Sequence, residues 1–113
     1  MQIESFLSDI EFDETRVKTK VIIETSFSKE IRILLKENQL MKEHQTPFPI
    51  LINIVSGEIE LGVNGINHTM KSGDIIALEG SVPHNLLANT DTIVRLTLSK
   101  HDKVERLENV INS

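Results

Sequence analysis

His44 and His84 are the side chains whose types and surroundings best suit chemistry. His44 and Thr46 stand two positions apart, so on a strand both side chains point to the same side. An imidazole can ligate a divalent metal ion or hydrogen-bond a small molecule. The chain has no Cys, which excludes thiol nucleophiles, and no Ser-His-Asp arrangement or phosphate-binding glycine loop can be argued from the sequence. Nucleophilic catalysis therefore has no candidate residue.

The two histidines lie in two separate patterns of regularly spaced residues. The first pattern consists of Asn38, His44, Thr46, Ile50 and Gly57, and the second of Gly73, Glu79, Ser81, His84 and Ala88. In this register the chain resembles the two motifs of the cupin superfamily. The resemblance covers about residues 30–98, and residues 58–72 match the short spacer between the motifs of small bacterial cupins.

The resemblance implies an all-β fold, a double-stranded β-helix of the cupin or jelly-roll barrel type. We expect a single domain over residues 1–113, with an N-terminal arm at 1–14 and a short C-terminal helix at about 100–111. Residues 1–14 also carry apolar side chains at helical spacing, so an arm and a helix both remain open there. The C-terminal helix is predicted because Ser99 and Asp102 resemble a capping box before an apolar stripe.

Alternating apolar and polar residues predict strands at residues 15–25 and 31–35, separated by a break at Ser26–Lys29. Further strands are predicted at 50–55, 58–63, 66–70, 75–78, 84–88 and 92–99. The clearest local signal is Asn64-Gly65, because a two-residue hairpin turn needs positive φ at both positions. Counting outward from this turn gives the register of the hairpin: Val63 with Ile66, Leu61 with His68, and Ile59 with Met70.

The resemblance also implies a small, mostly apolar pocket inside the barrel. Its expected ligand-binding residues are His44, Thr46, Phe48, Ile50 and His84. In the family a His-x-His pair, a Glu and a second-motif His bind one metal ion, but here Thr46 and Ile50 take two of those four places. Protein metal sites normally use three or four side-chain ligands. We therefore expect no cofactor; if a divalent ion (Zn, Ni, Fe or Mn) does bind, His44 and His84 are its ligands.

We predict a small-molecule-binding barrel without metal catalysis, whose ligand is largely apolar and carries an acidic or hydrogen-bond-accepting group. The alternative is a metal-dependent cupin enzyme of the dioxygenase or isomerase type that uses His44 and His84. In a third interpretation both histidines are buried and only structural. His68 remains open between a further nitrogen ligand and a cross-strand partner. Arg95 remains open between the pocket and the outer surface, and the cost of burying an unpaired charge favours the surface.

Composition narrows the choice of partners. The formal net charge of −5 argues against nucleic acid, and neither a signal peptide nor a membrane span is predicted, so we expect a cytoplasmic protein without a membrane partner. The strand at 50–55 is nearly all apolar, which indicates that both of its sides are covered. We expect an arm or a second subunit to cover Leu51 and Val55, and we expect a homodimer.

Overall fold

The structure is a computed structural model that describes residues 1–100 apart from the side chain of His44, so the helix predicted at about 100–111 lies outside the described residues. This part of the chain forms β1 (Lys18–Glu24), β2 (Ser28–Leu35), β3 (Leu40–His44), β4 (Ile50–Ser56), β5 (Glu58–Val63), β6 (Ile66–Lys71), β7 (Ile75–Leu78), β8 (His84–Ala88) and β9 (Thr92–Ser99). None of these residues forms a helix long and apolar enough to cross a membrane.

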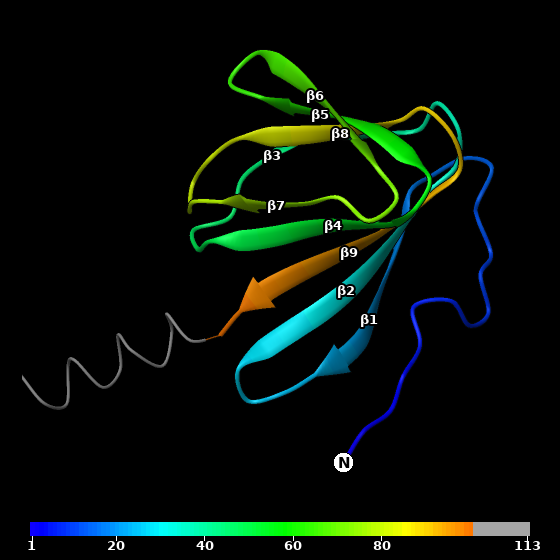
Figure 1. Cartoon of the computed structure of the whole chain (residues 1–113), viewed down its shortest axis with the longest axis vertical. Helices are drawn as coiled ribbons and strands as arrows, with labels where there is room; N and C mark the ends of the chain where they lie inside the picture. Colours follow the sequence, from blue (N-terminus) through cyan, green and yellow to red (C-terminus); the bar gives the residue numbers. More distant parts are fainter. Residues whose placement is uncertain (101–113) are drawn as a thin grey trace, which may run out of the picture.

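The strands form two antiparallel sheets that face each other (Figure 1). One sheet has the order β1-β2-β9-β4-β7, and the other has the order β3-β8-β5-β6. Each sheet combines strands from distant parts of the sequence, because β9 inserts between β2 and β4, and β8 inserts between β3 and β5. The predicted all-β class is therefore confirmed.

The space between the sheets is filled by aliphatic side chains. In β4 the residues Ile50, Ile52 and Ile54 point inward and are buried, while Leu51 on the other side is exposed. The other members of this core are Ile33, Leu35, Ile59, Leu61, Met70, Leu78, Leu86, Ala88 and Val94. Burial of this apolar surface drives folding of a chain that has no disulfide to stabilise it.

The hairpin of β5 and β6 has the predicted register. Asn64 and Gly65 both have positive φ, 52° and 78°, as a two-residue hairpin turn requires. The register pairs Val63 with Ile66, Leu61 with His68, and Ile59 with Met70. A local turn signal was sufficient here because the strand register follows from the turn by counting.

The first hairpin differs from the prediction at its turn. β1 begins at Lys18 rather than at residue 15, and β2 begins at Ser28, inside the predicted break. Thr25 closes the turn early, because its hydroxyl accepts from the backbone N–H of Ser28 at 2.9 Å. The polar start of β2 looks like a loop in the sequence because Ser28 and Glu30 carry no apolar signal, yet both are buried.

Residues 1–14 form an extended arm and no helix. The arm runs along the outer face of the sheet that contains β1, β2 and β9 (Figure 1). Arg32 of β2 donates to the carbonyl oxygen of Ser8 at 2.8 Å, and Gln39 donates to the carbonyl oxygen of Asp13 at 2.7 Å. These bonds hold the first half of the arm to β2 and the second half to the turn between β2 and β3, and Leu51 on the outer side of β4 stays exposed.

Candidate functional site

His84 is the first residue of β8 and is 2% exposed. Its Nδ1 lies 2.9 Å from the carbonyl oxygen of Val82, and because a carbonyl only accepts, Nδ1 carries the hydrogen of this bond. In a neutral ring Nε2 is then the acceptor nitrogen. The backbone of His44 pairs with that of His84 in the register of β3 and β8. The two histidines of the motifs therefore occupy one cross-strand position.

The segment between β3 and β4 packs against the loop that leads to His84. The backbone N–H of Ser81 donates to the carbonyl oxygen of Thr46 at 2.6 Å. A side chain at Gly80 would collide with the carbonyl group of Pro47, so only glycine permits this approach. The Thr46 hydroxyl in turn donates to the carbonyl oxygen of Phe48 at 2.8 Å. These contacts bring parts of the first and second motif together.

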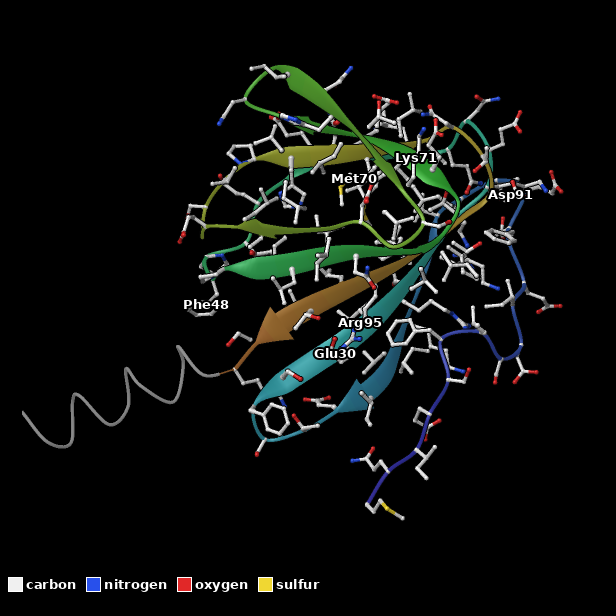
Figure 2. The ribbon with its side chains drawn as sticks, viewed as in Figure 1. Glu30, Phe48, Met70, Lys71, Asp91 and Arg95 are labelled. Atoms are coloured by element: carbon white, nitrogen blue, oxygen red, sulfur yellow. The ribbon has the colours of Figure 1, made fainter. Side chains whose placement is uncertain are left out.

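A cavity of about 230 Å³ opens beside this segment. Its lining consists of Thr46, Pro47, Phe48, Pro49, Leu98 and Ser99. Phe48 lies two residues before β4 (Figure 2), and it also lines a second cavity of about 380 Å³ together with Glu24, Lys29 and Lys100. Most of the side chains around the smaller cavity are apolar, so it suits a small apolar group.

The structure brings together only some of the predicted ligand-binding residues. Thr46 and Phe48 share the cavity, whereas Ile50 belongs to the packed core. His84 is buried next to Val82, and it lines none of the cavities that we describe around residues 1–100. Leu98 also lines the cavity, but sequence reasoning did not include it, because only the pairing of Ile50 with Leu98 brings the end of β9 to this segment.

No family model matches the chain, and no curated protein matches it in sequence. Solved structures do resemble it. An RmlC-like cupin protein from Desulfovibrio desulfuricans has a TM-score of 0.81 and 24% identity, over 88% of this chain and 96% of that one. The TT1209 protein of Thermus thermophilus has a TM-score of 0.80 and 12% identity, over 88% of this chain and 97% of that one.

A third structure names the architecture directly. It is an uncharacterized conserved protein with a double-stranded β-helix domain from Klebsiella pneumoniae, with a TM-score of 0.76 and 20% identity over 88% of this chain and 89% of that one. The chain has the cupin fold. The predicted double-stranded β-helix is thereby confirmed, while identities at this level carry the fold alone and no shared activity.

The ligand positions of this cupin fold do not suit a metal ion held by the four usual side chains. Ile50 has no donor atom and lies in the core, and the Thr46 hydroxyl donates to a backbone carbonyl. Among the side chains that the structure describes, no group of three or more His, Cys, Asp or Glu residues is placed to hold a metal. His68, the other candidate nitrogen ligand, is exposed on β6.

Arg95 lies on the outer face of the cupin barrel, the side that the cost of burying an unpaired charge favoured. Its Nε donates to Glu30 Oε1 at 2.9 Å, and its guanidinium lies 5.7 Å from the ring centroid of Phe6 in the arm. Sequence reasoning missed Glu30 because the predicted strand began after it. The alternation of Ser28, Glu30 and Arg32 was the available signal, since all three face the same side of β2.

Glu30 is held as a carboxylate in this buried position. Burial by itself raises the pKa of Glu30, but hydrogen bonds from Thr97, Arg95 and Ser28 and the charge of Arg95 together lower this pKa below its ordinary value. The Ser28 hydroxyl donates to Oε2 at 2.8 Å, and Thr97 and Arg95 donate to Oε1. This cluster on the outer face joins β2 to β9.

Proposed function

We propose that the protein binds a small, largely apolar molecule at the cavity beside Thr46 and Phe48, and that it does so without metal catalysis. The observation that supports this most directly is the apolar cavity itself, which is bounded by the first-motif segment and by the end of β9. The bond from Ser81 to Thr46 connects this cavity to the loop that precedes His84.

Size and lining define the class of ligand. A volume of about 230 Å³ is below the range of about 300–1,000 Å³ that is typical of pockets for drug-sized molecules. The apolar part of the ligand would lie against Phe48 and Leu98. We propose that its polar group is acidic and lies toward the cross-strand position of His44 and His84, where an imidazole can donate or accept a hydrogen bond.

Hexanoate is a suitable first probe, because it combines a short apolar chain with one carboxylate. We expect saturable binding in an NMR titration, with amide shifts at residues 46–49 and 81–84. Phe48→Ala should weaken binding, because it removes the aromatic ring from the apolar wall. His84→Ala should weaken it by about 1–3 kcal/mol, which corresponds to a rise in Kd of roughly 5- to 150-fold.

His68→Ala is the matched control, because His68 is an exposed histidine on another strand. We expect this variant to bind hexanoate as the wild type does. Full affinity in both Phe48→Ala and His84→Ala would reject the site. If His84→Ala folds poorly and Phe48→Ala has no effect on binding, the histidines are structural residues and the ligand site is elsewhere.

We also propose that the protein is a homodimer through the outer face of β4 and β7. β7 is an edge strand of its sheet, and Ile75 on it is 61% exposed. Leu51 and Ala77 are cross-strand partners on this face, and both are exposed. A second copy of the chain would bury this apolar surface and cover the edge of the sheet.

A further inference from the structure

Arg32 is a buried cation without an acidic partner in the described part of the chain. It lies in β2 on the face covered by the arm and is 5% exposed. Its Nη1 donates to the carbonyl oxygens of Ser8 and Phe6, at 2.8 and 3.5 Å. Its Nε is buried and has no hydrogen-bond partner among residues 1–100. A guanidinium is charged at any physiological pH, so this position carries a positive charge that forms no ion pair with a carboxylate of residues 1–100.

The neighbouring strands place more positive charge beside Arg32. The register pairs Arg32 with Lys20 of β1 on one side and with Arg95 of β9 on the other. Glu30 forms an ion pair with Arg95, and no described carboxylate forms one with Lys20 or Arg32. Like charges directly opposite each other destabilise a sheet. Of the three neighbouring cations Lys20, Arg32 and Arg95, only Arg95 therefore has a carboxylate partner among the described residues.

Two cavities lie between the arm and the sheet at this position. One has a volume of about 360 Å³, the other has a volume of about 280 Å³, and Asp9, Lys20 and Arg32 line both. Lys18 and Glu11 also line the larger cavity. Its charged side chains are therefore three cations and two carboxylates, a net charge of +1 (Lys18, Lys20 and Arg32 against Asp9 and Glu11). The space is large enough for several water-sized groups.

We propose that a small oxyanion binds between the arm and the sheet, next to Lys20 and Arg32. The ligand class is a phosphate or a carboxylate, because both present oxygens that accept from a guanidinium and an ammonium group together. Asp9 and Glu11 belong to the arm, which forms the opposite wall, so the anion is expected to be compact and to lie on the Arg32 side. This site is distinct from the cavity at Phe48 and does not depend on the proposed function.

Binding at this site also holds the arm against the sheet. The arm supplies one wall through Ser8 and Asp9, and β1 and β2 supply the other wall through Lys20 and Arg32. The hydrogen bond from Arg32 to Ser8 already joins the two walls. An anion that contacts Lys20 and Arg32 offsets their mutual repulsion and therefore stabilises the part of the sheet on which the arm packs.

The test is a titration of the full chain with inorganic phosphate and, separately, with malonate, against chloride at matched ionic strength. Amide shifts in an NMR spectrum report the site. We expect saturable shifts at residues 6–11 and 18–20 with at least one of the two anions. Binding of phosphate alone assigns the site to phosphates, binding of malonate alone assigns it to carboxylates, and binding of both assigns it to small oxyanions in general.

Variants show whether these residues hold the anion. Lys20→Met and Arg32→Lys should each weaken binding at least about tenfold, since the first removes a charge-assisted hydrogen bond and the second replaces the forked donors of a guanidinium by a single ammonium group. Lys71→Met, which removes an exposed cation from the other sheet, should leave binding unchanged. Lys20 is exposed, so Lys20→Met decides the question even if Arg32→Lys fails to fold. Shifts equal to those in chloride, or full affinity in Lys20→Met, would overturn the proposal.

Discussion

Arg95 and Glu30 form an ion pair on the outer face of the barrel, with Arg95 Nε donating to Glu30 Oε1 at 2.9 Å (Figure 2). The residues are not directly opposite each other, because Glu30 pairs in register with Thr97 and Arg95 pairs with Arg32. The ion pair is therefore diagonal across β2 and β9. Phe6 of the arm covers it, which makes this pair a junction of two strands and the arm.

Glu30→Gln tests the contribution of this junction to stability. We expect the free energy of unfolding near pH 7 to fall by about 1–3 kcal/mol, because a buried acceptor loses its charge while its donors remain. Urea unfolding measures this difference. Glu79→Gln, which changes an exposed carboxylate outside the junction, is the control and should have little effect.

The stability that Glu30 contributes should also depend on pH. The pKa of Glu30 in the folded protein is lowered, so the stability it contributes is present above its unfolded pKa of about 4.3 and is lost as the pH falls through the folded pKa. The difference in unfolding free energy between wild type and Glu30→Gln should therefore shrink as the pH is lowered below about 4. A difference that stays constant from neutral to acidic pH would contradict this assignment.

The proposed dimer predicts the mass of two chains in light scattering at micromolar concentration. Val55→Lys and Ile75→Lys should shift the protein toward the monomer, because each places an unpaired charge in the proposed interface. Ile66→Lys is a matched control, because Ile66 is 60% exposed and Ile75 is 61% exposed, but Ile66 lies on the other sheet. A monomer mass for the wild type, or equal effects of Ile66→Lys and Ile75→Lys, would contradict the interface.

Metal binding is expected to be weak. For protein purified without an affinity tag, chelator should leave the Tm unchanged. A chelator lowers the Tm only when it removes a metal that stabilises the folded state, and we expect no such metal here. Thr46→His with Ile50→Glu should lower the Tm without metal, since Ile50 is in the core and a carboxylate there is unpaired. Zinc should then raise the Tm of this double variant more than that of Thr46→His alone. A stoichiometric metal that survives dialysis of the wild type would reject the proposal of a metal-free site.

The sequence by itself determined the features that depend on neighbouring residues. The turn at Asn64-Gly65 and the register of β5 with β6 both follow from turn chemistry and the two-residue period of a strand. Asn38, between β2 and β3, has a φ of 72°, a left-handed conformation that Asn tolerates better than most residues. The spacing of the two motifs was needed to predict the fold. Local patterns do not specify the order of strands in a sheet, because that order depends on contacts between distant residues.

Only the tertiary structure decided what covers each face of the sheets. Alternating apolar and polar residues show that the two sides of a strand differ. The sequence pattern of the polar side is the same whether that side is exposed to water or covered by an arm. Glu30 and Arg32 look like surface residues in the sequence and are buried, because residues 1–14 fold back over β2. The cavity beside Phe48 likewise depends on Leu98, which reaches it only because β9 pairs with β4. Packing between distant segments therefore determined both candidate sites.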